Sequence, residues 1–445
     1  MEAEKYIVAL ELGSSKITGL AGYKNEEGQL IVSAIEKEDI AEYIKRGCIV
    51  NVRETAGRVK KIITKLENRI APHKITKLYV GISGQSLHSI DTTIPLQLPE
   101  DTQITDSIIE RIIAESKRIP VANTEIISVL PTEYIIDNRP EKNPVGVFGS
   151  NIEANLKLIV AKPSLKKNID TRLVEEIKLP VAGFILTPIV SASQVLTDEE
   201  KKLGCILIDF GAETTTVSIY KNDYLRYLVT IPLGSRNITR DIASLNVTES
   251  DAERIKILLG DAMGSRVDKD MKFNIEGIDS TQVNLNTCSR VIEARIEEIV
   301  ENVLAQIRYA KFDNKQLSAG IIIIGGGSKL KNIQELLAEK SGMKVRKGTL
   351  RKDIIIDSKE RNTGIEFIEG ISILAAGNNI CTVLPKQDKV EEEEEFYVPS
   401  KKEDKKKLKK IKEESHKNRN PFGGIVETLK NVSKKLLDES DEQIK

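Results

Sequence analysis

Tryptophan is absent from the 445-residue chain, and aromatic residues make up only 4% of it. This composition disfavours a protein that binds nucleic acid by stacking bases on aromatic side chains. Lys and Arg together number 67, and so do Asp and Glu, so no global positive field argues for nucleic acid either. No run of 18 consecutive apolar residues occurs, so we expect no helix that spans a bilayer.

Cysteine is also scarce, and its spacing excludes two kinds of site. The four cysteines stand singly at Cys48, Cys205, Cys288 and Cys381. No pair has the spacing of a metal site or a redox motif, which favours reduced thiols in a cytosolic protein. The acidic start of the chain does not resemble a signal peptide. The three histidines, His73, His88 and His416, are scattered, and no two of them have i, i+4 spacing. No catalytic triad is predicted.

Two segments far apart in the chain follow the same plan. Residues 9–19 (ALELGSSKITG) and 206–220 (ILIDFGAETTTVSIY) each run from a β-branched strand into an acid, a glycine turn and a row of hydroxyl residues. Because glycine has no Cβ, backbone N–H groups in such a turn can approach phosphate oxygens. One such turn alone is typical of an ordinary hairpin. Two in matching contexts predict facing hairpins that hold a nucleoside triphosphate from both sides.

The residues of these turns suggest roles by their chemistry. In the first turn, Lys16 offers a cation and Glu11 is placed to hold a water on Mg²⁺. The other predicted phosphate contacts of this turn are Gly13, Ser14 and Ser15. In the second turn the predicted set is Asp209 for metal or water, Gly211 for the bend, and Thr214 and Thr215 for the phosphates.

A third glycine turn lies roughly a hundred residues further on. Gly325, Gly326 and Gly327 follow the apolar strand 321–324 and precede a predicted helix over 330–340. A turn from strand into helix places N–H groups and the positive end of the helix beside an anionic ligand. Alone this signal is weak, but as the third of a set it supports nucleotide binding.

Strand-like and helical segments alternate along the chain, which predicts an α/β sheet. Helices are expected over 55–66, 249–259 and 291–311. Residues 84–161 interrupt the alternation with several strands around one short helix, 106–118, and predict an inserted α+β module.

The end of the chain differs from the rest. Residues 386–420 are rich in Glu and Lys and predict a disordered linker. In residues 421–445 an apolar stripe recurs at helical spacing: Ile425, Leu429, Val432 and Leu436, flanked by Val426 and Leu437. A short basic amphipathic helix on a tether is typical of segments that lie in a membrane interface, where the lysines attract anionic lipids. The alternative is a helix that docks on the protein's own core or on a partner.

The three glycine turns, in this order, resemble the phosphate 1, phosphate 2 and adenosine motifs of the actin, Hsp70 and sugar-kinase superfamily. Within it the chain resembles FtsA, the family of bacterial actin homologues in cell division. Residues 196–211, 231–243 and 251–256 are similar to the second large domain of that family. The insertion, with PVGVFG at 144–149, is similar to its 1C subdomain. The linker and amphipathic end complete the resemblance.

The resemblance implies an actin-like ATPase fold of two RNase H-like lobes, with an inserted α+β 1C (SHS2) subdomain and a disordered C-terminal tether. The expected parts are subdomain 1A (1–83, 162–192 and 365–385), 1C (84–161), 2A (193–237 and 312–364), 2B (238–311), a charged linker (386–420) and a membrane-targeting helix (421–445). By the same resemblance, Glu253 and Lys256 hold the ribose and adenine, and Gly326 and Gly327 lie beneath the nucleotide.

The implied function is that of a scaffold. A protein of this kind binds ATP and Mg²⁺, polymerises, binds the tail peptide of FtsZ in subdomain 2B, tethers the Z ring to the cytoplasmic face of the membrane and recruits later divisome proteins. Two departures from the family pattern favour at most slow hydrolysis. Glu11 stands where the family usually has Asp, and Glu213 adds a negative charge to a less glycine-rich second loop.

Three rival functions stay open on the sequence alone. A PilM-type pilus scaffold shares the insertion, but such proteins lack the long charged tether. An Hsp70-like ATPase needs a β-rich substrate domain after residue 384, and a sugar kinase needs a catalytic Asp over a sugar pocket, neither of which the sequence indicates. A nucleic-acid binder is disfavoured because the lysine-rich block is mixed with acids and free of aromatics.

Overall fold

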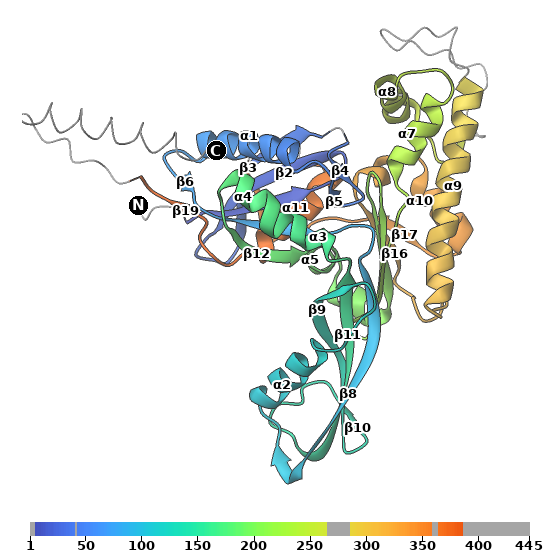
Figure 1. Cartoon of the computed structure of the whole chain (residues 1–445). Helices are drawn as coiled ribbons and strands as arrows, with labels where there is room; N and C mark the ends of the chain where they lie inside the picture. The colour runs from blue at the N-terminus through green and yellow to red at the C-terminus, as the bar shows by residue number, and fades with distance from the viewer. Residues whose placement is uncertain (1–4, 41, 265–284, 358–363, 386–445) are drawn as a thin grey trace, which may run out of the picture. The chain divides into compact units, whose positions relative to one another are not determined.

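The computed structural model describes residues 5–40, 42–264, 285–357 and 364–385 (Figure 1). Its first lobe is built on a six-stranded sheet. In order across the sheet the strands are β12 (Val181–Leu186), β7 (Leu78–Ile82), β1 (Ile7–Leu12), β2 (Lys16–Lys24), β3 (Leu30–Asp39) and β18 (Ile354–Ile356). Helix α1 (Val52–Arg69) packs against β2 and β3, and α11 (Ile368–Ala376) packs against β1, β2 and β7. β1 is buried along its whole length, as expected in the middle of a covered sheet.

Helix α1 shows how the local sequence sets this packing. The Asn51 side chain accepts a hydrogen bond from the Glu54 N–H and caps the first turn. The buried apolar residues recur at helical spacing and form one face: Ala56, Val59, Ile62 and Leu66. That face meets the sheet, and the charged residues between them remain outside. The predicted helix over 55–66 lies within the observed one.

A nine-stranded sheet carries the inserted module and the second lobe. Its strands, in order, are β10 (Arg139–Glu141), β9 (Glu125–Ile136), β11 (Phe148–Ala161), β8 (His88–Gln103), β15 (Tyr224–Ile231), β14 (Thr215–Lys221), β13 (Cys205–Phe210), β16 (Gly320–Ile324) and β17 (Val345–Lys347). The module joins the second lobe where His88 of β8 pairs with Val229 of β15. It has its own core, to which α2 (Asp106–Ser116) contributes Ile112.

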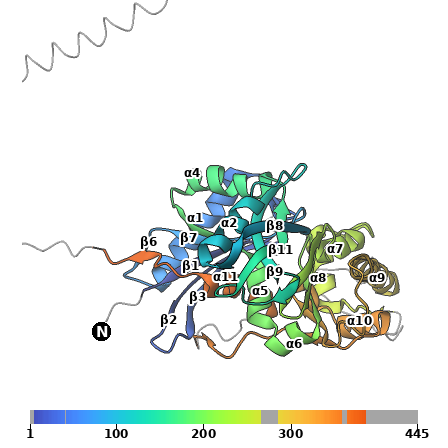
Figure 2. The ribbon, with the colours of Figure 1, turned by 90° about the horizontal axis from the view of Figure 1, so that it is seen from below.

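Helices of the second lobe gather beside its strands (Figure 2). They are α6 (Asp198–Leu203), α7 (Ser235–Ala243), α8 (Glu249–Leu259), α9 (Leu285–Tyr309) and α10 (Ile333–Ser341). Shorter elements are β4 (Ile44–Lys45), β5 (Cys48–Ile49), β6 (Lys74–Ile75), α3 (Ser164–Lys167), η1 (Asn168–Leu173), α4 (Val174–Ile177), η3 (Gly326–Lys329), η5 (Ile365–Phe367) and β19 (Thr382–Val383).

A separate hydrophobic cluster joins the two lobes. It brings Ile82 of β7 together with Leu207 of β13 and Ile322 of β16, and each of these residues has 2% or less of its surface exposed. Helix α5 (Thr187–Val195) contributes to the same cluster and packs against α11. The two lobes are therefore connected by a packed hydrophobic core.

The structure departs from the sequence-based expectations in two places. The glycine run does not open a long helix, because η3 is a single tight turn and α10 begins only at Ile333, after Asn332 in a left-handed conformation (φ 57°). The helix expected over 330–340 therefore forms, as α10 over 333–341, but the expectation that its positive end lies at the glycines is wrong. The strand β18 pairs with β3 of the first lobe, although residues up to 364 were assigned to subdomain 2A.

Other predictions concern residues that the structure does not describe. The charged linker 386–420 and the proposed membrane face (Ile425, Val426, Leu429, Val432, Leu436 and Leu437) lie outside the described residues. Among the residues that are described, none belongs to a helix with the length and apolar character needed to cross a bilayer.

Candidate nucleotide-binding cleft

A cavity of about 1110 Å³ lies between the two lobes. Its walls come from the β1–β2 turn of the first lobe and from the β13–β14 turn, α7, α8 and η3 of the second, with α11 at its base. This volume is sufficient for a nucleotide, since small-molecule sites in proteins are of this order or smaller.

The two turns predicted to face each other have the same backbone plan. In the first, Leu12 pairs with Ile17, and in the second Phe210 pairs with Thr215. A Cβ on Gly13 would lie 2.8 Å from the Lys16 carbonyl oxygen, and one on Gly211 would lie 2.8 Å from the Thr214 carbonyl oxygen. A contact that close is not available to a side chain, so each turn requires glycine at this position.

The matching register places the two acids in equivalent positions. Glu11 pairs with Thr18 across the first hairpin, and Asp209 pairs with Thr216 across the second. The repeat noticed in the sequence is therefore a repeat in three dimensions, with one hairpin contributed by each lobe.

Most of the predicted site residues line this one cavity. They are Glu11, Gly13, Ser14, Ser15, Lys16, Asp209, Gly211, Thr214, Glu253, Lys256, Gly326 and Gly327. Thr215 does not line it, because its side chain is completely buried and its hydroxyl donates to the Leu233 carbonyl oxygen at 2.8 Å. The next residue along the strand, Thr216, lines the cavity instead, as the alternation of side chains in a strand requires.

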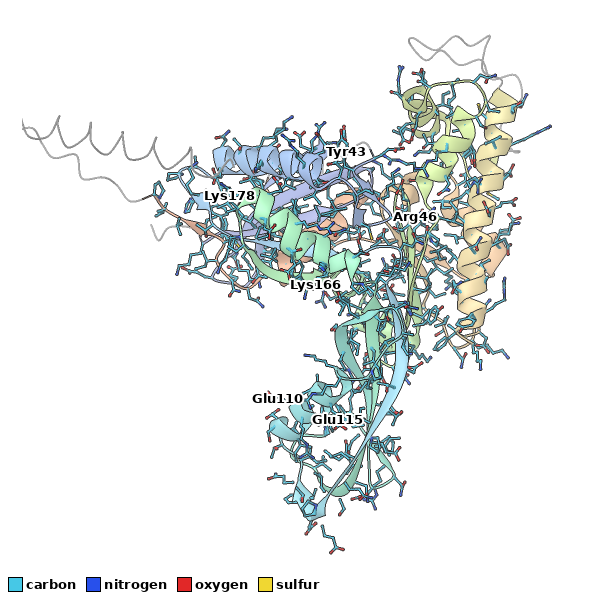
Figure 3. All side chains as sticks on the ribbon, in the orientation of Figure 1. Tyr43, Arg46, Glu110, Glu115, Lys166 and Lys178 are labelled. Carbon is cyan, nitrogen blue, oxygen red and sulfur yellow. The ribbon has the colours of Figure 1, made fainter. Side chains whose placement is uncertain are left out.

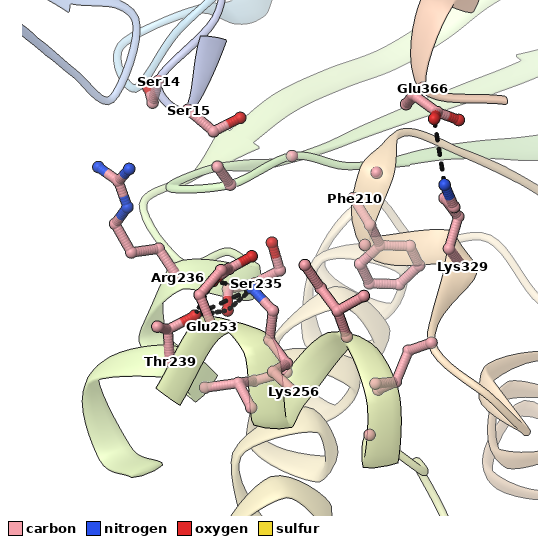
Figure 4. Close-up of a pocket in the computed structure, with 18 of the residues that line it drawn as sticks. Ser14, Ser15, Phe210, Ser235, Arg236, Thr239, Glu253, Lys256, Lys329 and Glu366 are labelled. Atoms are coloured by element: carbon pink, nitrogen blue, oxygen red, sulfur yellow. Dashed lines mark hydrogen bonds and ion pairs between the residues drawn. The ribbon is translucent and has the colours of Figure 1, made fainter. Parts of the chain in front are cut away.

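A hydrogen-bonded cluster on α7 and α8 forms the wall of the cleft shown in Figure 4. The Thr239 hydroxyl donates to Glu253 Oε2 at 2.5 Å, and Lys256 Nζ donates to the same oxygen at 2.7 Å. Lys256 Nζ also donates to Thr239 Oγ1 at 2.9 Å and to the Ser235 carbonyl oxygen at 3.3 Å. Burial raises the pKa of Glu253, but the charge and hydrogen bond of Lys256 outweigh burial and lower the net pKa. Glu253 is therefore held as a carboxylate.

Three carboxyl groups lie at the base of the cleft. Burial raises the pKa of Glu11 to about 7, although Lys16 and Thr18 act in the opposite direction. Burial also raises the pKa of Asp209. The pKa of Glu369, on α11, is raised well above its usual value, first by burial and then by the charges of Asp209 and Glu11. Glu369 is not among the residues predicted from the sequence, although an acid inside an apolar helix was a visible signal.

The arrangement fits a cation held through water. Within the described parts of the chain, no three or more His, Cys, Asp and Glu side chains are grouped so as to ligate a metal directly. However, Glu11 Oε2 and Asp209 Oδ1 are buried without a hydrogen-bond partner. Mg²⁺ usually keeps several waters and is held by one or two carboxylates together with phosphate oxygens, which these two oxygens match.

Two cationic residues not predicted from the sequence also line the cleft. Arg236 on α7 and Lys329 in η3 extend towards it (Figure 4). Lys329 Nζ lies 3.1 Å from Glu366 Oε1, and Lys16 Nζ lies 4.0 Å from the centre of the Phe367 ring. The cleft thus offers cations from both lobes, as a polyphosphate requires.

Glu213 does not play the part expected from its place in the second turn. Its side chain is buried, with 4% of its surface exposed, and it does not line the cleft. Its carboxylate accepts hydrogen bonds from the Arg46 N–H at 2.8 Å and from Arg240 Nη2 at 2.9 Å, and Arg236 Nη1 lies 3.5 Å away. Its charge is therefore neutralised by arginines and is not directed at a bound triphosphate.

Comparison with known proteins places the chain in a family. The family model for "Cell division protein FtsA" matches residues 206–366, and the model for "SHS2 domain inserted in FTSA" matches residues 84–160. The cell division protein FtsA of Porphyromonas gingivalis is 32% identical over 373 residues, which cover 81% of this chain and 75% of that protein. FtsA of Pseudomonas aeruginosa is 27% identical over 409 residues, covering 88% and 97%.

Among solved structures, a PilM–PilN type IV pilus biogenesis complex matches with a TM-score of 0.59 and 15% identity, covering 83% of this chain and 97% of that one. That identity is low enough to show the fold alone. The predicted fold class, an actin-like ATPase fold with an inserted SHS2 subdomain, is confirmed. Sequence identity and both family models distinguish the family from the pilus scaffold, and the chain belongs to the FtsA family of bacterial cell division proteins.

Proposed function

We propose that this FtsA-family chain binds Mg²⁺–ATP in the cleft between its lobes. The observation that carries the proposal is the pair of equivalent glycine turns that face one cavity from opposite lobes. Ser14 and Ser15 would contact the β- and γ-phosphates from the first lobe, and Gly211 and Thr214 from the second. Lys16 and Arg236 supply the positive charge that a triphosphate needs.

The wall and base of the cleft suggest how the rest of the ligand is held. Glu253 and Lys256 form an ion pair in the wall of the cleft, which Gly326 and Gly327 also line, and we propose that this pair holds the ribose and adenine with the two glycines beneath the nucleotide. Mg²⁺, when bound, neutralises charge on the phosphates, and Glu11 and Asp209 would hold its waters. Because Glu213 is fixed by Arg46, Arg236 and Arg240, the second turn is tied in one conformation. We propose that the chain retains bound ATP and hydrolyses it slowly at most.

The cellular role that we propose is that of a scaffold at the division site. The chain would polymerise, bind the FtsZ tail peptide through the region 238–311, tether the Z ring to the cytoplasmic face of the membrane and recruit later divisome proteins. Family membership supports the role in division. The amphipathic pattern of residues 421–445 supports the membrane tether.

Isothermal titration calorimetry tests the nucleotide proposal. The full chain should bind ATP with a 1:1 stoichiometry in the presence of Mg²⁺ and more weakly when the metal is chelated. A Lys16→Met variant, which removes the cation from the first turn, should bind ATP more weakly. Binding that is equally tight in Lys16→Met and wild type, or no binding in the wild type, would contradict the assignment of the cleft.

Pelleting with anionic liposomes tests the tether. The full chain should pellet, and a version that ends at Lys386 should stay in solution. Leu429→Glu should release the full chain, because it puts a charge into the apolar stripe. Asn431→Glu is the matched control, since at 100° per residue it adds the same charge on the opposite face. Equal release by both variants, or pelleting of the truncated version, would argue for a partner-docking helix.

A further inference from the structure

A tight turn in the first lobe lies where that lobe faces the second (Figure 3). It connects β4 to β5, and both of its central residues, Arg46 (φ 50°) and Gly47 (φ 83°), have left-handed backbone conformations. A two-residue hairpin of this kind favours glycine. Here space also requires it, because a Cβ on Gly47 would lie 2.4 Å from the Ser83 carbonyl oxygen and 2.5 Å from Gly84 Cα. The turn therefore packs closely against residues 83–84.

The backbone N–H groups of this turn point to the two glycine turns of the cleft. The Gly47 N–H donates to Ser14 Oγ in the first turn at 3.3 Å. The Arg46 N–H donates to Glu213 Oε2 in the second turn at 2.8 Å. Two neighbouring residues thus contact both of the turns that face the cleft, one in each lobe.

The same turn contacts the connections of the inserted SHS2 subdomain. The Gln85 N–H donates to the Arg46 carbonyl oxygen at 2.9 Å, and Arg46 Nη1 donates to Gln85 Oε1 at 3.2 Å. Next to it, the Lys162 N–H donates to Ser86 Oγ at 3.0 Å. Residues 85–86 lie at the start of the inserted subdomain and Lys162 directly follows its end, so the two ends are joined to each other and to the turn.

Glu213 connects the second lobe to the Arg46–Gly47 turn of the first lobe. Its carboxylate reaches across to the Arg46 N–H while Arg240 and Arg236, both on α7, neutralise its charge. A buried carboxylate with donors on two lobes holds them in one relative position, since loss of either set leaves a buried charge unpaired. A change in the spacing of the two glycine turns must therefore move the Arg46–Gly47 turn or break this contact.

We propose that Glu213 is a positioning residue that acts through the Arg46–Gly47 turn and couples the nucleotide-bound state of the cleft to the orientation of the inserted subdomain. The inference rests on the proposed nucleotide binding and goes beyond it, because it assigns a residue outside the cleft to the transmission of its state. Bound nucleotide draws the two glycine turns together. The Arg46–Gly47 turn, which is hydrogen-bonded to both, moves with them, and residues 84–86 move with the Arg46–Gly47 turn.

Hydrogen exchange of the full chain, followed by mass spectrometry with and without Mg²⁺–ATP, tests the coupling. In the wild type, nucleotide should slow exchange at the Arg46 amide and in residues 84–88. In Glu213→Gln the Arg46 amide should exchange about tenfold faster without nucleotide, because its bond to a charged acceptor is lost. Nucleotide should no longer change exchange in residues 84–88 of this variant, while calorimetry shows that it still binds.

Two further variants separate coupling from general destabilisation. Arg240→Gln removes the positive charge that pairs with Glu213 Oε1 at 2.9 Å. This variant should weaken the nucleotide effect on residues 84–88. Glu200→Gln is the matched control, because the Glu200 carboxylate also pairs with an arginine, Arg346 at 2.6 Å, but does so within the second lobe. Its other hydrogen bond is accepted from the Thr197 N–H and does not involve the Arg46–Gly47 turn, so the nucleotide effect should persist. A full nucleotide effect in Glu213→Gln, or an equal loss in Glu200→Gln, overturns the inference. A wild type that binds no nucleotide by calorimetry would instead refute the proposed function, and the coupling with it.

Discussion

Glu11 offers a direct test of the electrostatics at the base of the cleft. Its side chain is 8% exposed, and its pKa is raised from 4.5 to about 7, chiefly by burial. The native protein therefore keeps the proton of Glu11 at pH values where the unfolded chain has lost it. Native stability should fall as pH rises through the window from about 4.5 to about 7, and the full loss is present above it.

The size of the loss follows from the shift. One pKa unit corresponds to about 1.4 kcal/mol, so a rise from 4.5 to about 7 amounts to about 3 kcal/mol. Glu11→Gln resembles the protonated side chain and removes the penalty. The variant should match the wild type near pH 4.5 and should exceed it by up to about 3 kcal/mol at pH 8.

Urea denaturation of the nucleotide-free chain, followed by circular dichroism because the chain has no tryptophan, measures this difference across pH. Glu38→Gln is the control of opposite sign. The hydrogen bond from Lys65 lowers the pKa of Glu38, so Glu38 stabilises the native protein above about pH 4.5 and its removal should cost stability at neutral pH. A stability difference between Glu11→Gln and wild type that stays constant from pH 5 to pH 8 would refute the reasoning.

Three further predictions concern single side chains. Gly326→Leu should lower Mg²⁺–ATP affinity in calorimetry by about tenfold or more, because a Cβ at Gly326 meets no protein atom within 4 Å and projects into the cleft. Gly57→Leu, at an equally open position on α1, should leave this affinity unchanged. Thr239→Ala removes the hydroxyl shared by Glu253 and Lys256 and should weaken nucleotide binding by about 1–2 kcal/mol. Thr64→Ala, whose hydroxyl donates to the Lys60 carbonyl oxygen on α1, should leave affinity unchanged. Ile112 is fully buried in the core of the inserted subdomain, so Ile112→Ala should destabilise that subdomain by about 2–5 kcal/mol. Hydrogen exchange should become faster in β8, β9 and β11 while Mg²⁺–ATP affinity stays unchanged. An equal fall in affinity would show that the core of the subdomain supports the cleft.

Much of the cleft could be predicted because its signals are local. A glycine turn between two strands, with an acid before it, is a short-range pattern whose geometry follows from sterics, and both such turns form as expected. The long helices were also predictable, since the apolar spacing of α8 and α9 is visible without knowledge of their partners. The inserted subdomain, predicted over 84–161, coincides closely with the SHS2 match at 84–160.

The sequence was less informative where a residue's role depends on what folds against it. Glu213 follows a glycine turn and so was expected to face the triphosphate, but Arg46, Arg236 and Arg240 draw it away. Arg46 lies far from Glu213 in the chain, and no local pattern indicates the pairing. In the same way β18 joins the first sheet through a long-range pairing with β3, which segment order alone does not reveal.

What the sequence determined by itself, then, was the pair of acid–glycine hairpins and the family to which they belong, because turn geometry and strand pairing across a short loop depend on adjacent residues. Only the tertiary structure decided which side chains face the cleft. The Thr215 side chain is buried in the core, while Thr216 lines the cavity. Glu369, on a helix distant in the sequence, lies close enough to Glu11 and Asp209 for their charges to raise its pKa. The physical reason is that burial, and with it the pKa of a carboxyl group, is set by everything packed around it, and those neighbours are brought together only by folding.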